Sequence, residues 1–283
     1  MELPFKPDLT DKVAVVTGGA GVLCSAFCRA LAACGARVAV LGRTAAKVDA
    51  LAAELRAAGG KTIGLAADVT DKESLQAAYA LLKNTWGPCD ILVNGAGGNR
   101  PDATADDEFF SAETMDDPAK KSFFDLTETA FGEVFSLNLL GTVLPTQVFA
   151  ADMARAGHGC IVNISSMNAF TPLTKIPAYS AAKAGVSNFT EWLAVHFAGS
   201  GVRVNAIAPG FFSTAQNAKL LWNEDGSPTA RTGKILAATP MGRFGKPEEL
   251  IGSLLFLCDE HCSGFITGVV LPVDGGFRAY SGV

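Results

Sequence analysis

The chain has 283 residues, of which 49% are hydrophobic and 18% are charged, and its formal net charge at pH 7 is −5. This composition is typical of a globular protein with a large core, and a negative chain lacks the basic face that nucleic-acid binding requires. No uninterrupted apolar stretch reaches the roughly 18 residues of a membrane helix, and the N-terminus has no apolar signal core. We therefore expect a cytoplasmic protein that binds neither nucleic acid nor a membrane.

Apolar and helix-forming segments alternate along the whole chain. The apolar segments predict strands at residues 12–16, 37–42, 62–69, 90–97, 159–166, 202–209 and 268–276. The segments between them predict helices over residues 23–35, 44–58, 128–156, 179–198 and 247–259. Gly35 suits a helix C-cap, and Thr70 to Glu73 has the pattern of a capping box before a further helix. Pro145 predicts a bend in the long helix, and residues 211–240 are rich in loop formers.

This alternation determines the expected fold. Strands separated by helices predict an α/β protein with a single-domain Rossmann-type doubly wound parallel sheet of about seven strands, spanning residues 1–283. Ligands of such sheets bind beyond the carboxyl ends of the strands. The first glycine cluster, Asn94, Ser166 and Pro209 all fall at such ends, so we expect the functional site there.

The seven cysteines are an odd set without a Cys-x-x-Cys pair, which is typical of small buried side chains in a reducing compartment. Cys24 and Cys28 are four residues apart, as on a helix face that packs on a sheet. Cys258, His261 and Cys262 are close in sequence, but no fourth ligand with suitable spacing follows them. We therefore expect no metal site.

Tyr179 and Lys183 are four residues apart at the start of a predicted helix, so their side chains share one face. An ammonium about 4 Å from a tyrosine, at an effective dielectric constant near 20, stabilises the ionised form by roughly 4 kcal/mol. The pair should therefore lower the tyrosine pKa and suit a general acid or base. Ser166 ends the preceding strand and is placed to donate to a carbonyl oxygen. The alternatives to this catalytic interpretation are that Tyr179 and Lys183 are an ordinary pair on a helix surface, and that Ser166 is only a helix-cap or turn residue.

With these residues, the chain resembles the short-chain dehydrogenase/reductase family nearly from end to end. The family's Tyr-x-x-x-Lys motif matches Tyr179 and Lys183, its catalytic serine matches Ser166, and its helix asparagine matches Asn138. The resemblance implies hydride transfer between a nicotinamide and a carbonyl or alcohol carbon. Tyr179 would exchange the proton with the substrate oxygen, which Ser166 would polarise. Lys183 would lower the tyrosine pKa and hold the nicotinamide ribose, and Asn138 would position a water that relays protons to Lys183.

The resemblance extends to the dinucleotide site, with departures. The family's Asn-Asn-Ala-Gly motif appears as NGAG, with Gly95 in place of an asparagine, and its Thr-Gly-x-x-x-Gly-x-Gly loop carries Val22 and Cys24 at the later glycine positions. Gly21 would then supply backbone freedom, and the amide of Leu23 would face the pyrophosphate at a helix N-terminus. The expected cofactor-binding residues are Gly18, Gly21, Val22, Leu23, Arg43, Asp68, Val69, Asn94, Ala96, Gly97, Lys183, Pro209, Gly210 and Thr214.

The end of the second predicted strand indicates the type of dinucleotide. NAD-dependent enzymes of this fold usually carry an acidic residue there, which accepts a hydrogen bond from the ribose 2′-hydroxyl. Here Gly42 takes that position and Arg43 follows. Because arginine suits a 2′-phosphate, we predict that NADP(H) is preferred. NAD(H) would be usable if Arg43 only stacks on the adenine.

The stretches GAGGNRP, TPMGRFG and DGGFRAYSGV resemble the D-mannonate oxidoreductase (fructuronate reductase) group of the family. This resemblance implies interconversion of D-fructuronate and D-mannonate. We expect a flap insertion at about 98–127 and a substrate loop at about 211–240, with Arg100 and Lys175 as the first candidates to bind the carboxylate. The expected substrate-binding residues are Asn99, Arg100, Ser166, Asn168, Lys175, Tyr179 and Asn217, with Gln216 and Arg231 as further candidates.

Two alternatives stay open at this point. The first is an enzyme for another keto sugar, keto-uronate or polyol, which the catalytic motifs do not distinguish. The second is a non-catalytic dinucleotide-sensing protein, although such proteins commonly lose the catalytic residues that are all present here. The family is usually dimeric or tetrameric, and the apolar face of residues 185–199 fits a helix-to-helix interface. We therefore expect a homo-oligomer, either a dimer or a homotetramer.

Overall fold

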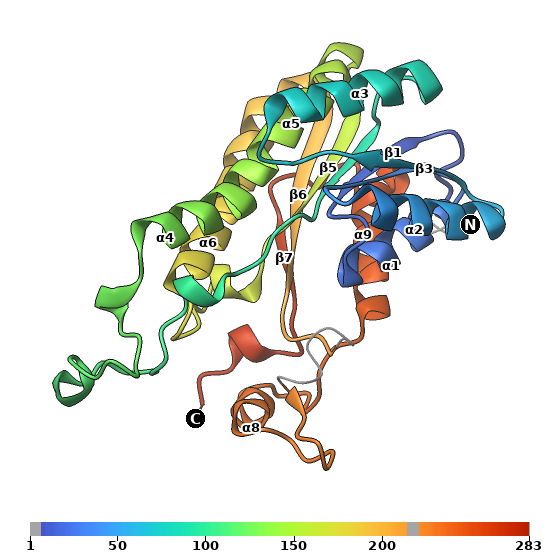
Figure 1. Cartoon of the computed structure of the whole chain (residues 1–283). Coiled ribbons are helices and arrows are strands. Elements are labelled where there is room, and N and C mark those ends of the chain that lie inside the picture. The colour runs from blue at the N-terminus through green and yellow to red at the C-terminus, as the bar shows by residue number, and fades with distance from the viewer. Residues whose placement is uncertain (1–6, 214–220, 283) are drawn as a thin grey trace.

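The chain forms a seven-stranded, all-parallel sheet with helices on both faces (Figure 1). The computed structural model describes residues 7–213 and 221–282. The strands are β1 (Val13–Thr17), β2 (Arg37–Gly42), β3 (Lys61–Ala66), β4 (Ile91–Asn94), β5 (Gly159–Ile164), β6 (Val202–Pro209) and β7 (Val270–Val273). Their order in the sheet is β3-β2-β1-β4-β5-β6-β7. The chain adds strands on one side of β1 up to β3 and on the other side from β4 onward, and sheets of this type bind ligands at the point between β1 and β4. The predicted α/β fold is confirmed.

Helices cover the two faces in separate groups (Figure 1). The described α-helices are α1 (Val22–Ala33), α2 (Ala45–Ala57), α3 (Lys72–Trp86), α4 (Glu128–Phe135), α5 (Gly141–Ala156), α6 (Pro177–Phe197), α8 (Ala230–Ala237), α9 (Ile251–Cys258) and α10 (Glu260–Ser263). Helices α1, α2 and α9 pack on one face, and α3, α5 and α6 pack on the other. The central strands are therefore buried on both sides and are largely apolar, whereas the edge strands β3 and β7 are only partly buried.

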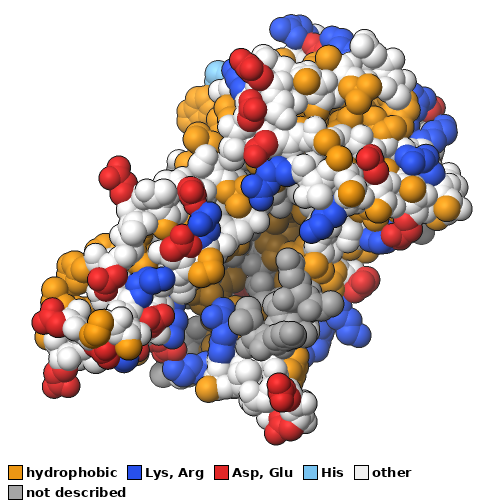
Figure 2. Space-filling model, viewed as in Figure 1, with side chains coloured by type: hydrophobic (Ala, Val, Ile, Leu, Met, Phe, Trp, Pro, Cys, Tyr) orange, Lys and Arg blue, Asp and Glu red, His pale blue; other side chains and the backbone are white. Residues whose placement is uncertain are grey.

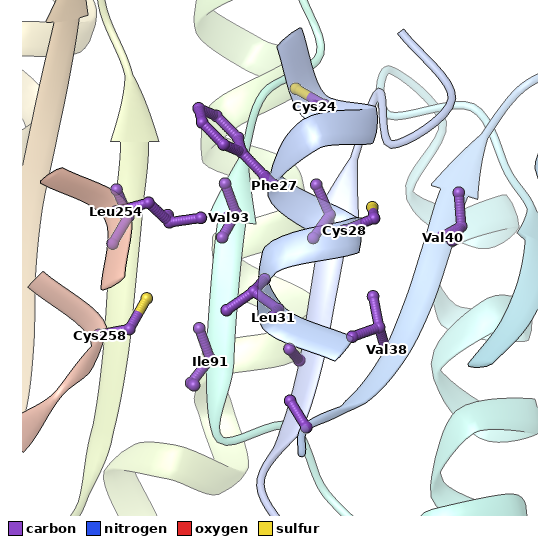
Figure 3. Packing of buried hydrophobic residues seen from close by; sticks show 14 of the residues in the cluster. Cys24, Phe27, Cys28, Leu31, Val38, Val40, Ile91, Val93, Leu254 and Cys258 are labelled. Carbon is purple, nitrogen blue, oxygen red and sulfur yellow. The ribbon is translucent and has the colours of Figure 1, made fainter. Parts of the chain in front are cut away.

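Alternate residues of β1 enter the two cores. Ala14 and Val16 belong to the core beneath α1, whereas Val13 and Val15 belong to the core beneath α5. Figure 3 shows Phe27 and neighbouring α1 side chains packed on the sheet in the first of these cores. Cys24 and Cys28 are buried on this same α1 face, so the predicted role of these cysteines as core side chains is confirmed.

The predicted capping box before α3 is wrong by one residue. Asp71, not Thr70, is the N-cap, and its carboxylate accepts hydrogen bonds from the backbone amides of Glu73 and Ser74 at 2.9 and 3.2 Å. Thr70 instead donates its hydroxyl to the Asp68 carboxylate at 2.7 Å. A carboxylate satisfies two amides at once, and its charge also suits the helix N-terminus.

The long helix predicted over 128–156 is interrupted, but not at Pro145. A π-helical segment, Ser136–Leu140, joins α4 to α5, and Pro145 lies inside α5. The interruption coincides with Asn138, whose side-chain amide donates to the carbonyl oxygen of Val134 at 2.8 Å. A side chain bonded into the helical ladder is a recognised cause of such irregularities.

The same segment, Glu128–Ala156, is long and apolar enough to cross a membrane, with a mean hydropathy of 1.4. Half of its most apolar window is buried inside the protein, and α5 packs on the sheet beside α3. This burial is typical of the core helix of a globular protein.

Two irregular regions extend from the carboxyl edge of the sheet. Residues 98–127, the predicted flap, contain three short 3₁₀ helices and project beside α4 (Figure 1). The 211–240 region was predicted as loop, yet it contains α8. Thr229 caps this helix by accepting from the amide of Thr232 at 3.2 Å.

Candidate active site

A groove of about 1160 Å³ runs along the carboxyl edge of the sheet. Figure 2 shows a hollow with an apolar interior and with Lys and Arg side chains around it. The predicted cofactor-binding residues that line the groove are Gly18, Gly21, Val22, Leu23, Arg43, Ala96, Gly97 and Gly210, and the substrate candidate Arg231 lines it as well. Lining residues that the sequence reasoning missed include Thr44, Lys47, Phe211, Phe212, Ile235 and Phe244. Lys47 lies one helical turn after Thr44, and Phe211 directly follows the Pro-Gly motif. These positions in the sequence indicate that both residues lie near the groove.

The glycine loop after β1 reaches its shape differently from the prediction. Gly18 has a φ of +63°, in the left-handed region that favours glycine. Gly21 has a φ of −74°, which any residue adopts, and it is the N-cap of α1. A Cβ on Gly21 would lie 3.0 Å from the carbonyl oxygen of Gly18. Gly21 is therefore suited by its small size and not by backbone freedom.

The two departures from the family motifs contact each other. The Sγ of Cys24 lies 3.7 Å from the carbonyl oxygen of Gly95, and a Cβ on Gly95 would overlap with that sulfur. Cys24 thus fills the space that a side chain at position 95 would need. The cysteine in the nucleotide loop and the glycine in the NGAG motif are mutually compatible, whereas a cysteine with the family asparagine would collide.

Three of the predicted cofactor-binding side chains point elsewhere. The amide nitrogen of buried Asn94 donates to Thr146 Oγ1 at 3.0 Å and to Asn163 Oδ1 at 2.9 Å, inside the sheet. Val69 is buried in the core beneath α5, and Pro209 is a buried residue of β6. Asn94 affects the groove only through the Gly95–Gly97 backbone that follows it. These side chains face inward because the strand or turn that carries them is covered by a helix.

Basic side chains lie at the end of the groove that is formed by the C-terminus of β2. Arg43 and Lys47 both line it, and both are exposed. Asp68 does not line it. Burial acts to raise the pKa of its carboxyl group, but two hydrogen bonds from Thr70, with a smaller contribution from the charge of Arg43, hold this pKa below its usual value. This end therefore offers two cations for phosphate and one carboxylate set back from the groove.

Lys183 lies buried between the groove and the sheet. Only 3% of its surface is exposed, and its Nζ donates to the carbonyl oxygen of Ile164 at 2.8 Å. A Cβ on Gly97 would lie 3.2 Å from this Nζ, so glycine at 97 leaves the ammonium accessible from the groove. Burial lowers the pKa of Lys183 to about 8, and the nearby Cys24 opposes this shift.

Tyr179 and Ser166 lie together beside this lysine. Tyr179 is in the first turn of α6, Ser166 is close enough to its hydroxyl to affect the tyrosine pKa, and the Lys183 Nζ lies 5.7 Å from the centre of the tyrosine ring. Burial raises the pKa of Tyr179, and the nearby Ser166 hydroxyl only partly offsets this shift. The expectation that Lys183 lowers this pKa is wrong, because its ammonium donates to the carbonyl oxygen of Ile164 and burial has the larger effect on the tyrosine.

Asn138 connects the catalytic helices to the NGAG loop. Its side chain is fully buried, accepts from the amide of Gly98 at 3.1 Å and donates to the carbonyl oxygen of Gly98 at 2.7 Å. A Cβ on Gly97 would lie 2.7 Å from the Asn138 Oδ1. The asparagine therefore holds the Gly97–Gly98 backbone in place, directly next to the lysine.

The predicted carboxylate-binding cations are both engaged with other groups. Arg100 is exposed and forms ion pairs with Asp102 and Glu133. Lys175 donates to the carbonyl oxygen of Asp106 in the flap. Asn99 is exposed and donates to Thr104 at 2.9 Å. Neither Arg100 nor Asn99 lines the groove or the cavity that contains Lys175.

Asn168 lies two residues after Ser166, and its backbone amide donates to the serine hydroxyl at 3.2 Å. It is 5% exposed, and within residues 7–213 and 221–282 its side-chain oxygen has no hydrogen-bond partner. Such a buried acceptor is costly unless something donates to it. Thr214 and Asn217, and also Gln216, lie outside the described residues. The described part of the chain contains no group of three or more His, Cys, Asp or Glu suited to a metal.

Comparison with known proteins decides the family. A family model described as short chain dehydrogenase matches residues 12–225. The chain belongs to the short-chain dehydrogenase family. It is 54% identical over 282 residues to the uncharacterized oxidoreductase UxuB of Bacillus subtilis (strain 168), covering 99% of this chain and 100% of that protein.

Solved structures that resemble this chain contain nicotinamide dinucleotides. A crystal structure of a Haemophilus influenzae protein assigned as a D-mannonate oxidoreductase, with bound NAD, matches with a TM-score of 0.94 at 52% identity and covers 98% of each chain. A gluconate 5-dehydrogenase from Burkholderia cenocepacia J2315, in complex with NADP and tartrate, matches with a TM-score of 0.81 at 28% identity and covers 98% of this chain and 99% of that one. The present short-chain dehydrogenase is therefore an NAD(P)-dependent oxidoreductase acting on alcohol or ketone groups.

Proposed function

We propose that this short-chain dehydrogenase interconverts a keto sugar acid and its alcohol, specifically D-fructuronate and D-mannonate. The observation that carries the chemistry is the placement of Tyr179 close to Ser166 and to the buried Lys183, next to the Gly97 backbone that lines a dinucleotide-sized groove. The similarity to the Haemophilus influenzae protein supports the choice of sugar acid. Lys175, Arg231 and Lys234 line a cavity next to the groove, which supports a negatively charged substrate.

The groove fits a nicotinamide dinucleotide by its shape and by its donors. Gly18, Gly21 and Gly97 leave space that a Cβ would fill, and the N-terminus of α1 offers free amides for a pyrophosphate. Arg43 and Lys47 would hold a ribose 2′-phosphate, so we propose a preference for NADP(H). When bound, the nicotinamide supplies or accepts the hydride.

The chain's own residues handle the proton and the substrate oxygen. Ser166 donates a hydrogen bond to the carbonyl oxygen and polarises it, and Tyr179 donates its hydroxyl proton to that oxygen as the hydride arrives. In the oxidative direction the tyrosine takes the proton back. Asn168 follows Ser166, and its unpartnered buried oxygen is suited to accept from a substrate hydroxyl.

Lys183 stabilises the ionised tyrosine that this step creates. A tyrosinate next to an ammonium in a site shielded from water is favoured more strongly than it would be in solution. Because the Lys183 pKa is lowered only to about 8, the amine stays mainly protonated at neutral pH. Asn138 supports this arrangement by holding the backbone beside the ammonium, and a water between Asn138 and Lys183 that relays the proton stays a prediction.

The decisive experiment is a substrate screen. D-fructuronate, tagaturonate, other keto-uronates and neutral keto sugars are each combined with NADPH and with NADH, and turnover is followed by nicotinamide absorbance. Reduction of D-fructuronate with the highest kcat/KM, abolished in Tyr179→Phe while NADPH still binds, supports the proposal. A protein that binds NADPH tightly but turns over none of these compounds would instead be a dinucleotide sensor.

Assembly into a homo-oligomer stays a prediction, as does the cytoplasmic location. The α6 face predicted as an interface does present large apolar side chains, because Trp192 is 57% exposed and Val195 is 79% exposed. Light scattering of the purified protein would establish whether a dimer or a tetramer forms.

A further inference from the structure

A second cavity of about 490 Å³ lies between the flap, α8 and the segment that leads into α6. Its described lining includes Lys175 and Ile176 before and at the start of α6, and Arg231, Lys234 and Ile235 of α8. The rings of Phe211 and Phe277 pack edge to face with their centres 5.2 Å apart and form an apolar wall. The charged lining residues come from three segments far apart in sequence, the flap, the segment before α6 and α8.

The charged lining of this cavity is strongly unbalanced. Three cations, Lys175, Arg231 and Lys234, are accompanied by one carboxylate, Glu108. Glu108 is already committed to Lys234, since the Oε1–Nζ distance is 2.8 Å and this hydrogen bond lowers the pKa of the carboxyl group. Lys175 is committed to the carbonyl oxygen of Asp106. Within residues 7–213 and 221–282, Arg231 has no ion-pair partner.

Arg231 also connects this cavity to the dinucleotide groove. Arg231, Ile235 and Phe211 line both spaces, which are therefore adjacent across α8. The inner wall belongs to the catalytic helix, because Ile176 precedes its first turn and accepts a hydrogen bond from the amide of Ser180. Tyr179 lies one turn of helix from this wall. A molecule that reaches from Tyr179 into the cavity meets the cations at its far end.

We propose that this cavity is the subsite for the substrate carboxylate and that Arg231 is the residue that binds it. The inference rests on the proposed sugar-acid function, which it deepens by naming the residue that selects acids. In D-fructuronate three hydroxyl-bearing carbons separate the keto carbon from the carboxylate, so the two groups cannot occupy the same subsite. The guanidinium suits a carboxylate because it donates two parallel hydrogen bonds. Lys175 and Lys234, tied to the flap, add positive potential and hold the cavity walls together.

The test compares an acid with a neutral ketone of the same length. The kcat/KM values for D-fructuronate and D-fructose are measured at saturating NADPH, and their ratio is taken as the readout. Arg231→Ala should lower this ratio by about 10- to 100-fold, as expected for a lost charged hydrogen bond. Arg231→Lys should lose less, because it keeps the charge. Lys61→Ala, an exposed cation outside both cavities, is the control and should leave the ratio unchanged.

Two results would overturn the proposal. One is an unchanged ratio in Arg231→Ala, provided that its urea unfolding midpoint matches the wild type. The other is a raised KM for NADPH with equal losses for acid and neutral ketone, which would make Arg231 a cofactor-binding residue.

Failure of the proposed function would look different. If the wild type reduces no keto-uronate, tartrate is tested as a competitive inhibitor against the best ketone found. A Ki that rises in Arg231→Ala supports the carboxylate subsite even then, and a Ki that does not change overturns it.

Discussion

Adding one methyl group to Gly95 should destabilise this enzyme, because Cys24 occupies the space. A Cβ at this position would overlap with the Cys24 Sγ and would also lie 3.0 Å from the carbonyl oxygen of Thr17, which is closer than an ordinary contact of roughly 3.5 Å. The φ of Gly95 is not positive, so the backbone itself tolerates alanine. Overpacking of this kind costs about 1–3 kcal/mol, and we expect Gly95→Ala to lower the free energy of unfolding by that amount.

The pair is best tested by a double-mutant cycle. Cys24→Gly alone should cost about 1–2 kcal/mol, because it places glycine in a helix and removes a buried thiol. In the double variant the added Cβ enters the vacated space, so the combined loss should be smaller than the sum by at least about 1 kcal/mol. The same cycle with Gly95→Asn restores the family motif at both positions and should show coupling of the same sign.

Urea unfolding followed by far-ultraviolet circular dichroism provides the free energies. Gly252→Ala is the matched control, since a Cβ on Gly252 meets nothing within 4 Å, and it should combine additively with Cys24→Gly. If Gly95→Ala costs as much in the Cys24→Gly background as in the wild type, Cys24 does not fill this space and the compensation argument fails.

Three further predictions concern stability and cofactor choice. Lys183→Met should abolish turnover yet raise stability at pH 7 by up to about 3 kcal/mol, since burial lowers the Lys183 pKa from 10.5 to about 8. Burying the charged lysine lowers the stability of the wild type by the full amount below pH 8, and this loss disappears as the pH approaches 10.5, because the unfolded chain keeps the lysine proton up to that pH. The difference in urea midpoint between Lys183→Met and the wild type should therefore be smaller at pH 10 than at pH 7, and an equal difference at both pH values would contradict this. Arg43→Ala should reduce the NADPH-to-NADH ratio of kcat/KM about tenfold, and wild-type preference for NADH would refute the assignment. Asp71→Ala should cost about 0.5–2 kcal/mol in thermal or urea unfolding by removing the α3 N-cap, whereas Thr70→Ala should cost less.

The order of strands and helices was predictable from the sequence because it follows from burial. A parallel strand covered on both faces must be apolar along its length, and such segments stand out between helical ones. The exact start of α3 and the position of the interruption between α4 and α5 were predicted wrongly, because alternative short-range hydrogen bonds determine them. Asp71 and Thr70 are both good N-caps, and only the backbone direction before α3 selects Asp71. The break at Asn138 depends on a bond to Val134 that no periodicity shows.

The sequence by itself determined which residue types reach the carboxyl edge of the sheet, including Ser166, Tyr179 and Lys183, because strand ends and helical spacing place them there. Only the tertiary structure decided how they are engaged. Arg100 is paired with carboxylates of the flap and of α4, whereas Arg231 lines two cavities. Which of these arginines is available to a ligand depends on where distant segments of the chain meet. The tertiary structure also showed that Cys24 and Gly95, separated by 71 positions, are one packing unit. Contacts of this kind depend on how elements cross in space, and a local pattern of residues carries no information about that crossing.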